Sequence, residues 1–251
     1  MIWSAPKHQS TYSSIVTAIS IVSFGLVGWF FVERFGIMPG LERVSIIMML
    51  GIAAISYRAV IKNAKRYGIM FLILSGIIAL VFEYIWVQYC IPYGCFEYGN
   101  VLGSKILETV PWTVFVGWTP LIIWVYTILR QYIHKKRILI PLWAFVLTLI
   151  DMVLDPWAVL LGFWAFDAGG WYYNVPRSNF AGWMISWSVW MLLAHSILNK
   201  QKTTIQRTYS TGLTLSFFNF IAIFAHMWLA GLLWTILLTM YIFFVYTQPK
   251  R

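Results

Sequence analysis

Long apolar runs, separated by short charged or glycine-containing segments, are the feature of this sequence that most restricts its fold. The 251 residues are 61% hydrophobic and 10% charged, with a mean hydropathy of +0.76, whereas a soluble domain carries about 25% charged residues. A helix needs about 20 apolar residues to cross the hydrocarbon core of a bilayer. The sequence therefore predicts one all-α, polytopic integral membrane domain over residues 1–251, a helical bundle with no room for a separate soluble domain.

The apolar runs mark the expected membrane-spanning helices. The last run would make a helix of about 54 Å, much longer than a bilayer core of about 30 Å, so we divide it near residues 230–231. This division gives about eight spans, and an undivided run gives seven. In the fourth helix, Pro120 after Gly117 predicts a kink, and a kink can open a cavity. The runs cover residues 15–32, 44–61, 67–89, 111–132, 138–154, 180–198 and 211–246.

The basic residues alternate between rich and poor loops, as the positive-inside rule requires. The rule places both termini in the cytoplasm, and we expect a multi-pass plasma-membrane protein whose first apolar run is a signal-anchor. The net charge of +10 then reflects topology, not a nucleic-acid-binding patch. The predicted outer side carries only Arg34, Arg43, Lys105 and Arg177. The other basic residues fall on the cytoplasmic side: Lys7, Arg58, Lys62, Lys65, Arg66, Arg130, Lys135, Lys136, Arg137, Lys200, Lys202, Arg207, Lys250 and Arg251.

Three carboxyl groups are expected inside spans, where an ionisable side chain costs about 3 kcal/mol or more at the helix centre. Glu83 is either an acid of a functional site or a protonated carboxyl hydrogen-bonded to a neighbouring helix. Asp151 and Asp155 project from one helix face, and a carboxyl pair can supply one acid and one base. Asp155 before Pro156 also fits the N-cap of a short helix over residues 156–162, a role that does not exclude catalysis. We expect the three carboxyls to border one cavity, because a shared polar pocket would satisfy them all.

The connector over residues 163–179 has the polar and aromatic content of a lid over a site. Trp164 and Trp171 taken alone are expected in an interfacial aromatic belt. Arg177 is expected to pair with Asp167 or a lipid phosphate, and Ser178 or Asn179 to cap the next helix. The candidate substrate or lid residues are Asp167, Tyr172, Tyr173, Asn174, Arg177 and Asn179.

The remaining candidates for chemistry are few. Cys90 and Cys95 form either a disulfide or two small apolar fillers. The sequence has no Cys-x-x-Cys and no His pair at metal spacing, so we expect no metal or cofactor, and we interpret His195 and His226 as structural or interfacial. The pair Asp151 and Asp155 has the spacing of a magnesium-diphosphate site of membrane prenyltransferases, but the second acidic cluster that such a site needs is missing.

Two blocks of the sequence resemble the membrane hydratases of carotenoid biosynthesis, a family of the bisanhydrobacterioruberin hydratase and carotenoid 1',2'-hydratase type. The first is Glu83 followed by PYGCFEYGNVLG at residues 92–103, and the second is DMVLDPWAVLLGFWAFDAGGWYYNVPRSNFAGW at residues 151–183. The resemblance covers about residues 70 to 190. Phe96 stands where the family has Tyr, Tyr93 where it has Phe, and Asn174 where it usually has Gly. The substrate is therefore expected to differ within the polyene class.

The resemblance implies addition of water to the terminal alkene of an acyclic carotenoid end group, which gives a tertiary alcohol. Its implied partners are the carotenoid, membrane lipid and other enzymes of carotenoid biosynthesis. The residues fit acid/base catalysis by Glu83, Asp151 and Asp155 without a cofactor, with aromatic rings stabilising a carbocation. The alternatives are a membrane terpenoid or lycopene cyclase, which begins with the same protonation, and a proton-coupled transporter.

Overall fold

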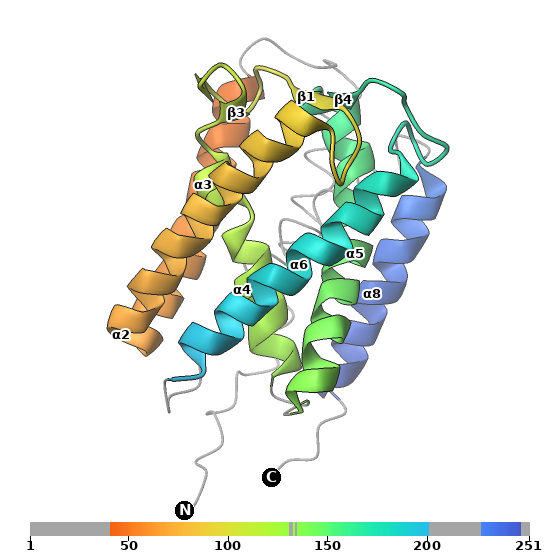
Figure 1. Ribbon diagram of the computed structural model, residues 1–251. Helices are drawn as coiled ribbons and strands as arrows, with labels where there is room; N and C mark the ends of the chain where they lie inside the picture. The colour runs from red at the N-terminus through yellow and green to blue at the C-terminus, as the bar shows by residue number, and fades with distance from the viewer. Residues whose placement is uncertain (1–40, 131–132, 134, 201–226, 247–251) are drawn as a thin grey trace, which may run out of the picture.

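The computed structural model describes residues 41–130, 133, 135–200 and 227–246 and shows a bundle of helices with short strands at one end (Figure 1). Met49–Tyr89 within α2, together with α5 and α6, are long and apolar enough to cross a membrane, which makes the chain a membrane protein. The expected helix over residues 15–32 and the first part of the 211–246 run lie outside the described residues. The helices are α2 (Leu41–Tyr89), α3 (Val114–Gly117), α4 (Thr119–Leu129), α5 (Lys136–Leu160), α6 (Arg177–Leu198) and α8 (Trp228–Tyr246).

Helix α2 contains both the second and the third predicted spans. It is interrupted at Lys65, whose φ of 45° and ψ of −126° are not helical. The chain turns back there, so both ends of α2 lie at the end of the molecule that carries the strands (Figure 1). The predicted separation of residues 44–61 from residues 67–89 is confirmed as this kink.

The backbone break predicted in the fourth span is also present. Trp118 separates α3 from α4, directly after Gly117 and two residues before Pro120. Proline lacks the N–H that an uninterrupted helix would use at this point. Gly117, Trp118 and Pro120 at this break line a cavity.

Two boundary predictions are wrong. Helix α5 continues through Pro156 to Leu160, so Asp155 lies inside a helix and is not the N-cap of a separate one. Proline is tolerated inside membrane helices because neighbouring groups satisfy the freed backbone. Helix α8 runs without interruption through residues 230–231, so the last apolar run does not divide there.

Two short antiparallel strand pairs lie at one end of the bundle (Figure 1). Strand β1 (Phe96–Tyr98), which follows α2, pairs with β4 (Trp164–Phe166), which follows α5. Strands β2 (Lys105–Ile106) and β3 (Val110–Pro111) form a hairpin. The β1–β4 pair therefore connects the ends of the two helices that carry the candidate carboxyls.

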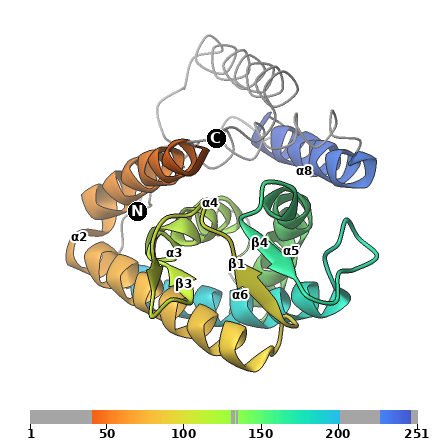
Figure 2. The same ribbon diagram turned by 90° about the horizontal axis from the view of Figure 1, so that it is seen from above.

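Helix α6 packs against both α2 and α5, and the three surround β1 and β4 when viewed from the strand end (Figure 2). Its fully buried residues include Trp187 and Trp190. At the opposite end of the bundle, the Arg130 side chain donates to Asn199 and lies 3.4 Å from His195 Nδ1. The kink at Lys65 lies at this same end, so the basic segments around Lys65 and Arg130 share one end of the bundle (Figure 1).

Cys90 and Cys95 form a disulfide. The sequence analysis allowed either this disulfide or two unpaired apolar side chains, and the structure shows the disulfide. The bond closes the loop between α2 and β1 and holds Tyr93, which is 1% exposed, beneath the strands.

The contact between the β1 and β4 loops depends on Gly99. A Cβ atom at this position would lie 2.0 Å from the carbonyl oxygen of Gly162. We expect Gly99→Ala to destabilise the protein by about 1–3 kcal/mol, as overpacking does, and to lower the apparent Tm in detergent by about 2–4 °C per kcal/mol. The matched control is Gly51→Ala on α2, where a Cβ meets nothing within 4 Å. An unchanged Tm for Gly99→Ala would contradict the close approach.

Candidate functional site

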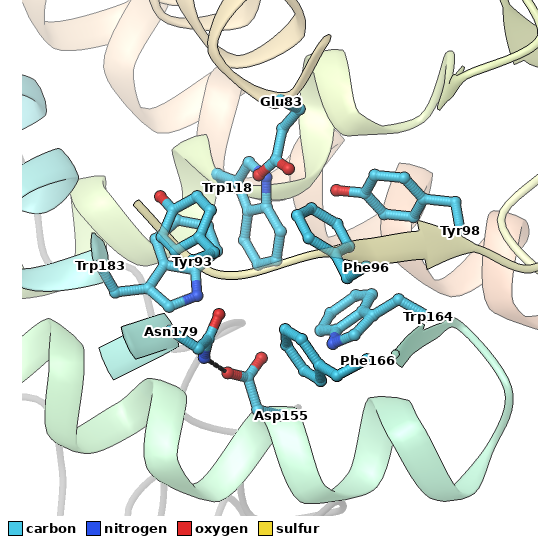
Figure 3. A pocket seen from close by; sticks show the side chains of 10 residues that line it. All are labelled: Glu83, Tyr93, Phe96, Tyr98, Trp118, Asp155, Trp164, Phe166, Asn179 and Trp183. Carbon is cyan, nitrogen blue, oxygen red and sulfur yellow. Dashed lines mark hydrogen bonds between the residues drawn. The ribbon is translucent and has the colours of Figure 1, made fainter. Parts of the chain in front are cut away.

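Glu83 on α2 and Asp155 on α5 line one small cavity, here called the carboxyl cavity (Figure 3). Both side chains are only 1% exposed. They point into the cavity from opposite sides (Figure 3). The cavity has a volume of about 10 Å³, which holds about one water molecule. The expectation that the intramembrane carboxyls border one cavity is therefore confirmed for Glu83 and Asp155.

Asn179 holds Asp155 in place from the first turn of α6. Its side-chain amide donates a hydrogen bond to Asp155 Oδ2, and the side chain is 3% exposed. The capping prediction for Ser178 and Asn179 is wrong, because α6 starts at Arg177 and has no side-chain cap. The Ser178 hydroxyl instead donates to the carbonyl oxygen of Tyr93 at 3.0 Å. Both polar side chains thus connect α6 to the site.

Asp151 lies one turn before Asp155 and is also 1% exposed, but it does not line the carboxyl cavity. The two carboxyl groups are close enough to interact electrostatically. Neither carboxyl oxygen of Asp151 has a hydrogen-bond partner among the described residues. Ionised carboxylates only accept hydrogen bonds, so the two groups can hydrogen-bond to each other only when one of them carries a proton.

Aromatic rings form most of the remaining lining of the carboxyl cavity. The Trp118 indole N–H and the Tyr98 hydroxyl face the Glu83 carboxyl (Figure 3). The described lining residues include no lysine or arginine, and their polar groups are carboxyls, hydroxyls, an amide and indoles. The aromatic lining residues are Tyr93, Phe96, Tyr98, Trp118, Trp164, Phe166 and Trp183.

The β1–β4 pair supplies four of these rings. Phe96 is opposite Phe166, and Tyr98 is opposite Trp164. Side chains alternate between the two faces of a strand, so these rings face the cavity while Glu97 is exposed. The expectation that Trp164 belongs to an interfacial belt is wrong, since it is buried, whereas Trp171 is 62% exposed. The alternation in the segments FEY and WAF is the only local sequence signal for these residues, and three residues are too few for it to stand out.

Two tyrosine hydroxyls near Glu83 stay protonated. Burial, followed by the nearby Glu83 carboxyl, raises the pKa of Tyr98 well above its ordinary value. The same two causes, in the same order, raise the pKa of Tyr93. The Tyr93 hydroxyl donates to Ser186 Oγ on α6 at 2.6 Å. Tyr98 therefore remains a hydrogen-bond donor at the Glu83 carboxyl throughout the physiological pH range.

Most of the predicted lid residues lie away from the carboxyl cavity. Tyr173 and Asn174 have positive φ values of 51° and 65° in the turn closed by the Tyr172–Val175 bridge, so Asn174 tolerates the backbone conformation that favours glycine. Tyr172 is buried in a separate cluster that includes Trp157.

The Tyr173 hydroxyl accepts a hydrogen bond from the backbone N–H of Leu229, at the start of α8, at 3.0 Å. Asp167 is exposed, and Arg177 stacks 5.3 Å from the Trp171 ring centre. Of the predicted substrate or lid residues, Asn179 alone lines the carboxyl cavity. The lid role of the others stays a prediction.

Comparison of this sequence with known proteins identifies the family of the chain. A family model described as carotenoid biosynthesis protein matches residues 43–246. The chain belongs to this family. A bisanhydrobacterioruberin hydratase of Haloarcula japonica is 38% identical over 108 residues, which are 41% of this chain and 36% of that protein. The aligned part thus spans little more than a third of the length of that curated relative. No solved structure matches the chain.

The match to the carotenoid biosynthesis family includes Glu83, Asp151 and Asp155. In the described part of this family member, no group of three His, Cys, Asp or Glu side chains is placed to hold a metal ion. The candidate site contains the carboxyl groups of Glu83 and Asp155. Hydrogen bonds from α6 position the site, and their contribution can be measured.

The hydrogen bond between Tyr93 and Ser186 provides a test of the packing of α6 against the site. We expect Tyr93→Phe and Ser186→Ala each to lower the free energy of unfolding by about 1 kcal/mol. The double variant should lose much less than the sum of the single variants, because both remove the same bond. Thermal unfolding in detergent measures this. Tyr89→Phe, at a site 69% exposed, is the control; additive losses would contradict the bond.

Proposed function

We propose that this protein is a carotenoid hydratase, which adds water to the terminal C=C bond of an acyclic carotenoid end group and forms a tertiary alcohol. The observation that carries this proposal is the position of Glu83 and Asp155 on opposite sides of a cavity that is lined by aromatic rings and large enough for about one water molecule. The family and the related hydratase support a polyene substrate. Hydration is redox-neutral and requires no cofactor.

The geometry favours Glu83 as the acid and Asp155 as the base. Protonated Glu83 gives its proton to the terminal alkene, whose π electrons form the new C–H bond and leave a tertiary carbocation. Aromatic faces stabilise that cation. Water then forms the C–O bond, and Asp155 takes the proton that the water loses. The N–H donor of Asn179 stabilises the ionised form of Asp155.

Asp151 has a positioning role in this proposal. If Asp151 carries the shared proton, it donates to Asp155 and leaves that group as the carboxylate that accepts a proton from water. An amide at position 151 can donate in the same direction. A carboxyl is therefore required at position 155, whereas a hydrogen-bond donor is sufficient at position 151.

Substitution of the three carboxyls tests these roles. We expect Asp155→Asn and Glu83→Gln each to lower hydration by at least about 100-fold, the lower end of what a positioned acid or base contributes. Asp151→Asn should cost much less than either. Asparagine at position 155 can still accept the Asn179 hydrogen bond, so the yield of folded protein should stay near normal. The measurement is pigment mass in cells that accumulate lycopene or another acyclic carotenoid.

The matched control is Glu97→Gln on β1, whose side chain is exposed and should leave hydration unchanged. A pigment mass that increases by one water supports hydration, whereas a converted pigment of unchanged mass would show a cyclase and refute the proposal. Near-normal hydration by Asp155→Asn would remove Asp155 as the base and make Asp151 the candidate.

We further propose that the chain crosses the plasma membrane several times, with both termini in the cytoplasm. The shared end of the basic segments around Lys65 and Arg130 supports this orientation. The disulfide between Cys90 and Cys95 supports it independently, because disulfides persist in oxidising compartments. The carboxyl cavity would then lie toward the outer leaflet.

Cysteine labelling tests the orientation. A membrane-impermeant thiol reagent added to intact cells should label Leu107→Cys in the β2–β3 hairpin and miss Lys135→Cys, and both positions are exposed. The native cysteines are paired in the disulfide and give little background. Permeabilised cells should label both variants. The reverse pattern in intact cells would place the carboxyl cavity on the cytoplasmic side.

A further inference from the structure

A second cavity lies beside the carboxyl cavity and is lined in part by residues at the break between α3 and α4. It has a volume of about 120 Å³ and is here called the apolar cavity. Gly117 and Leu121 line it from the break, and Leu154 and Ala158 line it from α5. Protein interiors contain few voids larger than a water molecule, so a space of this size next to a functional site indicates a ligand.

Trp118 and Trp164 line both cavities. Their ring centres are 6.0 Å apart, and the rings are inclined by 56°. The same two side chains therefore separate the larger apolar cavity from the smaller carboxyl cavity. A ligand group that passes between the rings would leave apolar surroundings and reach Glu83 and Asp155.

The chemistry of the apolar cavity selects an apolar chain. Among the described residues that line it, the only polar side-chain groups are the indole N–H groups of Trp118, Trp157 and Trp164, and apolar cavities of this kind do not hold ordered water. A cavity of about 150 Å³ lined by Leu, Ile and Phe binds benzene. The apolar cavity, with a volume of about 120 Å³, therefore suits a branched five-carbon unit. The cavity is too small for a cyclic end group with its ring methyls.

We propose that the apolar cavity binds the terminal isoprenoid unit of an acyclic polyene, and that Trp118 and Trp164 hold its alkene at the entrance to the carboxyl cavity. This inference rests on the proposed hydratase function and assigns the substrate subsite that the carboxyls alone do not define. Small side chains keep the subsite open: a Cβ at Gly117 would meet the Met49 methyl at 2.6 Å.

Pigment retention tests this subsite separately from catalysis. Asp155→Asn serves as the parent protein, because it should bind the substrate without converting it. The parent is purified in detergent from lycopene-accumulating cells, and the ratio of carotenoid to protein is measured by absorbance. Adding Ala158→Val should lower this ratio several-fold, and adding Ala158→Leu should lower it by at least about tenfold, since one methylene in an apolar pocket changes binding by that order.

The matched control is Ala54→Leu on α2, where the same enlargement is exposed. Unchanged pigment retention by a well-folded Ala158→Leu protein would overturn the subsite and would indicate that lipid acyl chains fill the cavity. If Ala158→Leu lowers the yield, Gly117→Ala replaces it, because its methyl contacts only the flexible end of Met49. That variant should also retain less pigment, and an unchanged ratio would overturn the proposal equally.

The outcomes separate the subsite from the reaction. If Ala158→Leu lowers pigment retention while the wild-type protein leaves the pigment mass unchanged, the subsite is supported and hydration is refuted. Hydration by the wild type with retention insensitive to Ala158→Leu would support the function and refute the subsite. A parent and a wild type that both retain no carotenoid and convert none would refute both.

Discussion

The burial of three carboxyl groups in a membrane-spanning bundle is the constraint on which the rest of the structure depends. Each such group costs about 3 kcal/mol or more at the centre of a span unless partners satisfy it. Helix α6 meets this requirement for Asp155 through Asn179, and strand β1 brings the Tyr98 hydroxyl to Glu83. The positions of the helices and strands around the carboxyl cavity follow from the need to deliver these partners.

Hydropathy and charge predicted the membrane class and the turn near Lys65, and proline predicted the break beside Pro120, because each of these signals is local in the sequence. The cost of intramembrane carboxyls also predicted that Glu83 and an aspartate would share a cavity. Local signals failed at Asp155 and Pro156, because an Asp-Pro dipeptide fits both the start and the interior of a membrane helix. Asp155 and Pro156 have the pattern of a helix start, but α5 continues because membrane helices accommodate proline.

The aromatic lining could not be predicted with equal success, because it depends on pairing between segments far apart in the chain. Strands β1 and β4 have three residues each, too few for a periodic signal to stand out. Tyr93 and Phe96 stand where the resembling family has Phe and Tyr. Both rings line the carboxyl cavity, and their centres are 6.3 Å apart. A hydroxyl is absent at Phe96, and the one at Tyr93 is bound to Ser186, which leaves Tyr98 as the hydroxyl directed at Glu83.

The dependence of α2 and α5 on α6 has a consequence for biosynthesis. Glu83 enters the membrane about 100 residues before Asn179 is synthesised, which at about 5–20 residues per second is an interval of roughly 5–20 s. During that time its carboxyl has neither α6 nor the β1–β4 pair around it. The nascent chain must therefore keep this segment near the insertion machinery or insert it with the carboxyl neutral, and the cavity closes only when the second half of the chain arrives.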